Sequence, residues 1–296
     1  MKAIVDSHHH IWRQADLPWL MGPMQPRIFG PYEAIRRDYP MREYLADLSG
    51  NGVVKSVYVQ TNWPKDRFED ETAWAQRTAQ ETGWPHAIVA YADFTVDDVR
   101  PQLDRLGRYP LVRGARMQLH WHENPLYRFA ARPDLCADPT LRRNIAALAD
   151  YGWSFDLQVF SPQMPGAAAL AEACPGVTFV LQHAGMSEDL SAAGRAEWRA
   201  GLVRLAACPN VVCKLSGLGT FLHRNDPAHI AEVVAETVAI FGADRCLFGS
   251  NFPIEKLWTS YGALIGAYRE AVASLSESQR GAVLADTANR VYRLGG

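Results

Sequence analysis

The chain opens with Ala3-Ile4-Val5-Asp6-Ser7-His8-His9-His10, in which an apolar run leads directly into polar side chains. The apolar residues predict a first β-strand. Because alternate residues of an extended chain point to the same side, we expect Asp6, His8 and His10 to project together. A carboxylate and two imidazoles that converge at the end of a strand form half of a metal or proton-transfer site. The opening stretch therefore predicts a functional centre at the end of the first strand.

The composition is that of a globular protein with a sizeable core, and we expect its partner to be a small-molecule substrate. The 296 residues are 48% hydrophobic and 21% charged, with a formal net charge of -2, so we expect no nucleic-acid partner. No apolar stretch approaches the roughly 20 residues of a membrane-spanning helix, and no signal peptide is recognisable, so we expect no membrane partner and a cytoplasmic location. The five cysteines are scattered and predict a reduced protein. The sequence leaves open whether copies of the chain form a homo-oligomer.

Short β-rich runs recur along the chain and alternate with segments of helical periodicity. The runs are residues 3–5, 54–60, 87–92, 112–119, 154–159, 178–181, 211–215 and 246–248. Helical segments between them include residues 72–82, 141–151 and 231–241. Strands that alternate with helices pair in parallel through crossovers. The pattern predicts an α/β fold, a (β/α)₈ TIM-type barrel that forms a single domain over residues 1–296.

The longest connection lies between the first two predicted strands. It contains residues 17–23 and 36–40 and is rich in Trp, Met and Pro. Long connections without regular structure in compact domains are usually functional. We therefore expect this loop to form a lid over one end of the barrel.

Polar side chains follow almost every predicted strand. Barrel enzymes place their chemistry at these carboxyl ends, and burying many polar groups toward one axis is costly unless they bind something. The residues at or near these ends are His8, His10, Gln60, Tyr91, Arg116, Gln118, His120, Asp156, Gln158, His183, Lys214, Ser216 and Asn251. Their convergence predicts a binding or catalytic site.

Several motifs in this order resemble one known family. They are Asp6-x-His8-x-His10, Val112-Arg113-Gly114-x-Arg116, Gln182-His183-Ala184-Gly185, Cys213-Lys214-Leu215-Ser216-Gly217, Phe248-Gly249-Ser250-Asn251-Phe252-Pro253 and the closing residues 288–294. Together they resemble the amidohydrolase superfamily, and within it the amidohydrolase 2 branch. That branch holds L-fuconolactone and L-rhamnonolactone hydrolases and 2-pyrone-4,6-dicarboxylate lactonase. The motifs extend over essentially the whole chain and are specific for the family, though not for a substrate.

The resemblance implies a (β/α)₈ hydrolase whose site residues can be assigned by position. His8 and His10 match ligands of a metal or of a substrate oxygen, and His183 matches the histidine of the sixth strand. The chain departs from the family pattern twice. Asn251 stands where the family usually has an aspartate that binds metal and accepts a proton from water, and Met117 stands where a histidine is usual.

The loss of the aspartate leaves the base that activates water open, because an amide cannot accept a proton near neutral pH. One alternative is a divalent metal, zinc or manganese, held by His8, His10 and His183, which would lower the pKa of bound water. A second is metal-independent catalysis with His183 as the base. A third is a carboxylate from Asp93 or Asp156. The sequence does not choose among these three.

The favoured reaction is the opening of a small lactone, either a sugar lactone or a carboxylated pyrone- or muconolactone-like compound, by an activated water. The candidate catalytic residues are His183, Asn251 and Lys214. The candidate substrate-binding residues are Arg116, Gln118, His120, Gln158, Tyr91 and Trp63. Two other functions remain open on the same scaffold: a metal-dependent decarboxylase or other lyase, and a ligand-binding barrel without catalysis.

Overall fold

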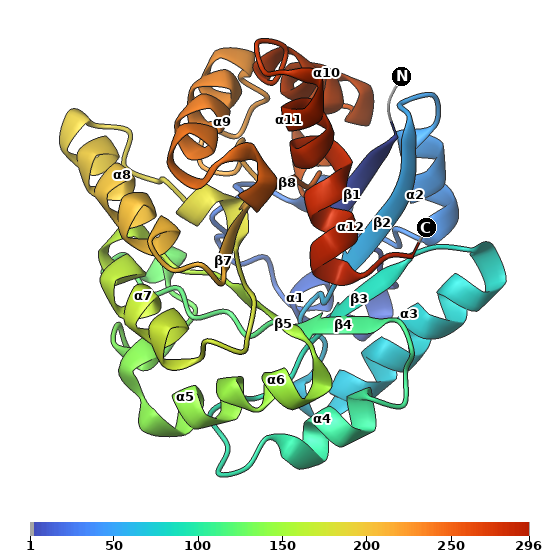
Figure 1. Cartoon of the computed structure of the whole chain (residues 1–296). Coiled ribbons are helices and arrows are strands. Elements are labelled where there is room, and N and C mark those ends of the chain that lie inside the picture. The colour runs from blue at the N-terminus through green and yellow to red at the C-terminus, as the bar shows by residue number, and fades with distance from the viewer. Residues whose placement is uncertain (1–2, 296) are drawn as a thin grey trace.

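Eight β-strands form one parallel sheet in chain order in the computed structural model, which describes residues 3–295 (Figure 1). The strands are β1 (Ile4–His9), β2 (Val53–Val59), β3 (Ala87–Ala90), β4 (Val112–Ala115), β5 (Ser154–Leu157), β6 (Phe179–Leu181), β7 (Val211–Leu215) and β8 (Cys246–Phe248). The segment after β8 returns to β1, where the backbone N–H of Asn251 donates to His8 and that of His10 donates to Phe252, each at 2.7 Å. The sheet is therefore a nearly closed barrel, and the predicted TIM-type fold is confirmed.

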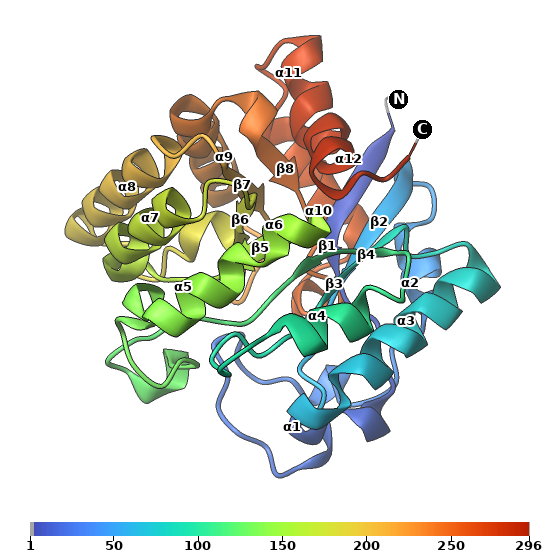
Figure 2. The ribbon, with the colours of Figure 1, turned by 60° about the horizontal axis from the view of Figure 1, so that its bottom comes forward.

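The helices cover the outside of the barrel (Figures 1 and 2). They are α1 (Pro18–Met21), α2 (Met41–Leu48), α3 (Phe68–Thr82), α4 (Arg100–Leu106), α5 (Pro139–Ala146), α6 (Leu148–Tyr151), α7 (Met164–Ala173), α8 (Ala192–Ala206), α9 (Pro227–Phe241), α10 (Tyr261–Ala271), α11 (Glu277–Gly281) and α12 (Thr287–Tyr292). Among the described helices, none has both the length and the apolar character needed to cross a membrane.

Two predicted helices have different bounds in the structure. The prediction of one helix over residues 141–151 is wrong, because α5 and α6 are separate elements on either side of Ala147. The helix predicted from residue 231 begins earlier, at Pro227. There the Asp226 side chain accepts hydrogen bonds from the N–H groups of Ala228 and His229, and proline occupies the first turn. An aspartate cap followed by proline is a strong start signal for a helix.

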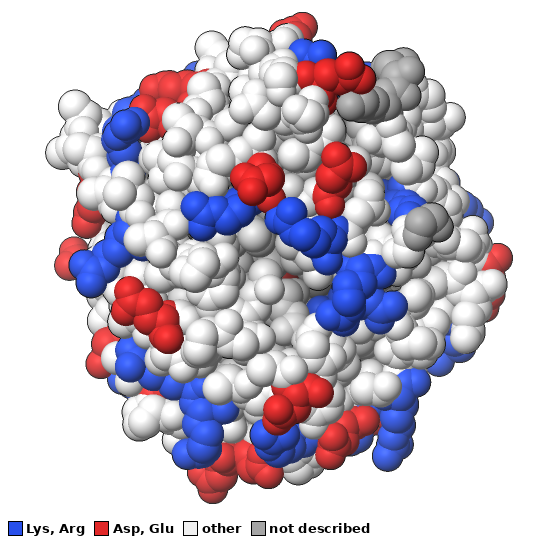
Figure 3. Space-filling view, viewed as in Figure 1, with Lys and Arg blue, Asp and Glu red and all other residues white. Residues whose placement is uncertain are grey.

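One end of the barrel interior is apolar and is covered by the C-terminal helices. Valines and a leucine that point inward from the strands pack against Tyr292 and neighbouring residues of the α12 region. Figure 1 is viewed from the side of α11, α12 and the two chain ends. Figure 3 shows Lys and Arg side chains interspersed with Asp and Glu over this face, in line with the small net charge of -2. The polar residues occupy the other half of the barrel interior.

A β-bulge interrupts β1 between Asp6 and His9. Asp6 pairs with Ser56 of β2, and His9 pairs with Tyr58, so β1 uses three steps where β2 uses two. The extra residue in a bulge shifts the alternation of side chains beyond it by one position. Residues before and after the bulge that are two apart in sequence therefore face opposite sides.

The bulge separates Asp6 from the two histidines that it was expected to join. The carboxylate of Asp6 accepts hydrogen bonds from the hydroxyl groups of Tyr44 in α2 (2.8 Å) and Tyr261 in α10 (3.1 Å). It therefore lies between the barrel and the helices, whereas His8 and His10 lie inside. The prediction that Asp6, His8 and His10 project together is wrong for Asp6, whose hydrogen bonds join β1 to α2 and α10.

The long loop between β1 and α2 begins and ends at a pair of backbone hydrogen bonds. Trp12 and Tyr39 each donate an N–H to the carbonyl of the other, at 2.9 and 3.0 Å. The indole of Trp12 also donates to the carbonyl of Arg37 at 2.7 Å. Figure 2 shows this loop, in blue around α1, at the same end of the barrel as the green segment between β4 and α5.

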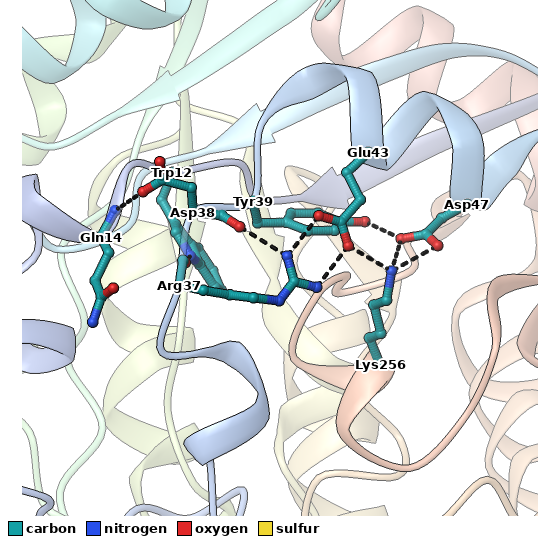
Figure 4. A network of polar contacts seen from close by, with 8 residues as sticks. All are labelled: Trp12, Gln14, Arg37, Asp38, Tyr39, Glu43, Asp47 and Lys256. Atoms are coloured by element: carbon teal, nitrogen blue, oxygen red, sulfur yellow. Dashed lines mark hydrogen bonds and ion pairs between the residues drawn. The ribbon is translucent and has the colours of Figure 1, made fainter.

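A network of charges holds the C-terminal end of this loop against the rest of the barrel (Figure 4). Both terminal nitrogens of Arg37 donate to Glu43 of α2 at 2.6 Å. Lys256, which follows β8, contacts Glu43 at 2.9 Å and Asp47 at 2.6 Å, and Asp47 also accepts from the Tyr39 hydroxyl. Networks of this kind contribute more than isolated surface pairs. The loop is thus fixed to both α2 and the segment that carries Asn251.

Candidate active site

A cavity of about 400 Å³ opens at the polar half of the barrel. Residues of the β1–α2 loop, among them Trp19 and Phe29, form part of its wall, as the lid prediction requires. Most of the predicted site residues line it: His10, Arg116, Gln118, His120, Gln158, His183 and Asn251. Four predicted residues, His8, Trp63, Tyr91 and Lys214, are not among the described residues that line it.

His8 and His10 lie against each other, with their Nε2 atoms 3.3 Å apart. The Nδ1–H of His10 donates to the carbonyl of Val59 at 2.7 Å, which leaves its Nε2 with a free lone pair. The Nδ1 of His8 is buried and has no partner among the described residues. An unpaired N–H costs more than an unpaired lone pair, so the ring proton of His8 belongs on Nε2, which donates to His10.

The backbone at the ends of β6 and β8 adopts unusual conformations. His183 and Asn251 have φ angles of 54° and 56°, in the left-handed region that residues other than glycine rarely adopt. Such strain is common at functional sites. Gly217, at φ 61°, allows the close approach of His183, because a Cβ at this position would lie 2.6 Å from its Nδ1. The same Nδ1 lies 2.9 Å from the hydroxyl oxygen of Ser216.

The histidines of the cavity are neutral at physiological pH. Burial, together with the nearby positive charge of Arg116, lowers the pKa of His10, His120 and His183 to about 3 in each case. The ammonium of Lys214 acts on His183 in the same direction. Neutral imidazoles can accept protons or bind metals, so their state suits either of those roles.

These lowered pKa values predict a loss of stability in acid. The unfolded chain binds protons at these histidines below pH 6.5, whereas the folded chain does so only near pH 3. Stability is therefore lost as the pH falls from 6.5 to about 3, by about 1.4 kcal/mol per pH unit for each histidine. Urea denaturation at pH 7, 6 and 5 measures this effect. His120→Gln should reduce the slope of the free energy of unfolding against pH by the contribution of one proton. An unchanged slope would contradict the lowered pKa of His120.

Lys214 lies beneath the cavity floor in an ion pair. Its side chain is fully buried, and its Nζ is 2.7 Å from Oδ2 of Asp156. The hydroxyl of Tyr292 donates to Asp156 at 3.0 Å. Gln182 donates to Asp156 at 2.5 Å and accepts from Arg116 at 3.2 Å, which links this pair to the floor. Lys214 therefore influences the cavity through its charge and is not placed to contact a ligand.

Trp63 and Tyr91, which are predicted to bind substrate, are also absent from the described lining of the cavity. The ring of Trp63 packs against Trp74, at 6.0 Å between centroids, and under the guanidinium of Arg67 at 4.9 Å. Tyr91 is buried near β3, and its hydroxyl has no partner among the described residues.

The metal implied by the resemblance can be tested against the histidine pair. Two nitrogens bound to one tetrahedral zinc, at 2.0–2.1 Å each, lie about 3.3–3.4 Å apart, and the Nε2 atoms of His8 and His10 are 3.3 Å apart. The hydrogen bond from His10 to Val59 is one that metal-bound histidines commonly make. His8 and His10 thus fit two positions of a divalent cation once the ring proton of His8 moves from Nε2 to Nδ1, which frees both Nε2 lone pairs. The ring centroid of His183 lies 4.8 Å from that of His8, but the described residues contain no group of three His, Cys, Asp or Glu side chains arranged to hold a metal. A third position filled by His183 stays a prediction.

Sequence reasoning missed Glu255, a buried carboxyl group next to Asn251. Burial raises its pKa to about 8, and the side chain of Asn251 forms a hydrogen bond with it as well as with His10. Trp258 donates its indole N–H to Glu255 at 3.0 Å. The sequence feature that could have identified Glu255 is its spacing from Asn251. It follows Asn251 by four residues, about one turn of a helix, so the two side chains can lie next to each other. Glu255 holds the amide that replaces the usual aspartate.

Sequence reasoning also missed two arginines that line the cavity, Arg27 and Arg128. Arg27 belongs to the β1–α2 loop, and Arg128 to the segment between β4 and α5. Their sequence neighbourhoods contain aromatic residues, and each guanidinium lies over a tryptophan ring, that of Trp19 or Trp121. An arginine near a tryptophan in a loop is only a weak indication of a binding residue. The folded structure is needed to show that these two arginines line the cavity.

Comparison with known proteins agrees with the resemblance seen in the motifs. The family model described as amidohydrolase matches residues 5–294. The chain is 36% identical to the protein y4mH of Sinorhizobium fredii, over 99% of both chains. It is 31% identical to an L-fucono-1,5-lactonase of Burkholderia multivorans, over 98% of this chain and 96% of the relative. A crystal structure of an amidohydrolase from Burkholderia multivorans with bound zinc has a TM-score of 0.82 and 29% identity, and covers 99% of this chain and 100% of its own. The chain therefore belongs to the amidohydrolase family.

Proposed function

We propose that this protein is a lactonase, which hydrolyses the ester bond of a lactone ring. The observation that carries the proposal is the presence of the neutral imidazole of His183, the guanidinium of Arg116 and the amide of Asn251 around one cavity. Ester hydrolysis needs a base for the water and a positive group for the oxygen that becomes negative. Two relatives from Burkholderia that are named L-fucono-1,5-lactonase support this reaction class.

The proposed reaction uses His183 as the base. Its imidazole takes a proton from a water molecule, whose oxygen bonds to the carbonyl carbon of the lactone while the carbonyl π electrons move to oxygen. Arg116 stabilises the resulting oxyanion. The ring C–O bond then breaks, and the leaving ring oxygen accepts from His183 the proton that came from water. The product is a hydroxy acid, which releases one proton to solvent when it ionises.

The charges around His183 match this sequence of steps. In the free protein, burial and the positive charges of Arg116 and Lys214 lower the pKa of His183, so the ring starts neutral. Negative charge that develops on the substrate next to Arg116 offsets that repulsion. The protonated ring is therefore favoured in the transition state more than in the free protein, which is the differential stabilisation that catalysis requires.

The other residues have roles that follow from their contacts. Asn251 orients the attacking water through its amide, which is held between His10 and Glu255. Asp93 and Asp156, the carboxylates considered as bases, are absent from the described lining of the cavity; Asp93 accepts a hydrogen bond from Thr95, and Asp156 pairs with Lys214. A divalent cation held by His8 and His10 would act as a Lewis acid that polarises the carbonyl group.

Turnover of a panel of neutral and carboxylated lactones tests the proposal. We expect one proton released per ring opened, with no carbon dioxide formed. Elemental analysis before and after chelation, followed by addition of zinc or manganese, measures the contribution of a metal. Release of carbon dioxide from a carboxylated compound would replace the proposal by a decarboxylase. Binding of lactones without turnover would replace it by a ligand-binding barrel.

A further inference from the structure

The cavity carries an excess of positive charge. Three arginines, Arg27, Arg116 and Arg128, line it, and no Asp or Glu does among the described residues of its lining. The histidines of the lining are neutral, as their lowered pKa values show, and add no charge. Arg116 is buried at the floor, where it contacts Gln60 and Gln182. The other two arginines come from loops that flank the opening of the barrel (Figure 2).

Arg27 has donors that the protein does not use. Its guanidinium lies over the ring of Trp19, with 5.6 Å between its central carbon and the ring centroid. Its Nε is buried and has no hydrogen-bond partner in the described part of the chain. A guanidinium has five N–H donors, and leaving buried donors unpaired is unfavourable. An acceptor from a ligand would relieve this cost.

Arg128 is held in place by backbone groups and a tryptophan. Its Nε donates to the carbonyl of His122 at 3.0 Å, and its Nη2 donates to the carbonyl of Glu123 at 2.9 Å. Its central carbon lies 4.9 Å from the ring of Trp121. These contacts leave Nη1 available for an acceptor from a ligand. The side chain is thus preorganised, which reduces the entropy lost when an anion binds.

The wall between the floor and these arginines is apolar. Phe29, Phe129 and Phe221 contribute to it, and Phe129 is 46% exposed. The volume of about 400 Å³ falls in the range of pockets that hold a ligand larger than a single small ring. The cavity therefore has a polar floor, an apolar middle and a cationic opening.

We propose that Arg27 and Arg128 form an anion subsite that binds a carboxylate of the substrate remote from the lactone ring. The substrate class is then a lactone that carries this carboxylate on an apolar or aromatic extension. Arginine suits a carboxylate because its planar fork matches two oxygens. The inference rests on the proposed function for the reacting ring, whereas the subsite rests on the charge and shape of the cavity.

Calorimetric binding of non-reactive dicarboxylates tests the subsite without any turnover. The probes are linear dicarboxylates from glutarate to azelate, which scan the spacing between two anionic ends, and the monoamide of the best binder. We expect the monoamide to bind at least about tenfold more weakly than its dicarboxylate. Arg27→Gln and Arg128→Gln should each weaken dicarboxylate binding by about the same factor, which removes the advantage of the dicarboxylate over the monoamide. Added salt should weaken dicarboxylate binding further.

The matched control is Arg132→Gln, which removes an arginine of the same segment. Arg132 pairs with Asp134 and Asp138 and is outside the described lining of the cavity, so this variant should bind as the parent does. Two independent variants guard against one that fails to fold, as judged by circular dichroism. Equal binding of dicarboxylate and monoamide by the parent, or a preference for the dicarboxylate that persists unchanged in both variants, would overturn the subsite. Absence of turnover on every lactone, with the binding pattern intact, would instead overturn the proposed function alone.

Discussion

Replacing His183 by alanine is expected to lower kcat for lactone hydrolysis by at least about 100-fold, the usual contribution of a general base. The imidazole lines the cavity beside Arg116 and Asn251, and no carboxylate is among the described residues of that lining. No carboxylate of the described lining can therefore replace the imidazole as the base. Initial rates of proton release, measured with a lactone that the parent hydrolyses, give the size of the loss.

The conformation of His183 calls for a second variant. Its φ of 54° is unfavourable for alanine, so His183→Ala can lose stability as well as its base. Asparagine tolerates this region and cannot accept a proton near pH 7, so His183→Asn separates the two effects. We expect the same loss of kcat with nearly unchanged urea denaturation. Ser216→Ala removes the partner of Nδ1 and should cost less. Full activity of His183→Asn would reject His183 as the base.

Replacing Lys214 by methionine is expected to destabilise the fold by about 3–5 kcal/mol, because it leaves a buried charge without its partner. Asp156 would retain the hydrogen bonds from Tyr292 and Gln182, but no cation would contact it directly. Urea denaturation measures the change as a lower midpoint at constant slope. A loss below about 1 kcal/mol would show that the hydrogen bonds alone hold the carboxylate.

Two control variants test whether the loss of stability in Lys214→Met comes from the buried, unpaired charge. Arg199 and Glu236 form an exposed pair at 2.7 Å, so Arg199→Ala should cost less than about 1 kcal/mol. The double variant Lys214→Met with Asp156→Leu removes both charges. It should recover much of the stability lost in the single variant, because two residues in contact are energetically coupled.

The barrel was predictable from the sequence because strands and helices alternate with regular hydrophobic patterns. The polar residues that follow the predicted strands include most of the predicted residues that line the cavity, among them Arg116, Gln158 and His183. The position of Asp6 was not predictable, because its direction depends on a bulge set by pairing with β2. The same limit applies to Lys214, whose partner Asp156 comes from another strand and lies below the floor. Local sequence patterns predict on which side of a strand a side chain lies. Its depth within the barrel depends on contacts with segments that are distant in the sequence.

The loops were the least predictable part of the site. Arg27 and Arg128 reach the cavity from segments without regular periodicity, and Glu255 reaches Asn251 through a short turn after β8. Such segments obey no repeating pattern, and only the folded barrel brings their side chains together. The chemistry at the floor could therefore be inferred from sequence, whereas the recognition at the opening could not.

The bulge in β1 also affects how the gene for this protein can change. An in-frame deletion of the codon for Ser7 would remove one of the three steps from Asp6 to His9, so that β1 would match β2 step for step. Under strict alternation Asp6 would still face the helices, and His8 and His10 would still face the cavity. A further deletion between Asp6 and His10 would have no extra residue to absorb it and would reverse the side chains beyond it. The strand can therefore lose one residue, but not two, without turning its histidines away from the cavity.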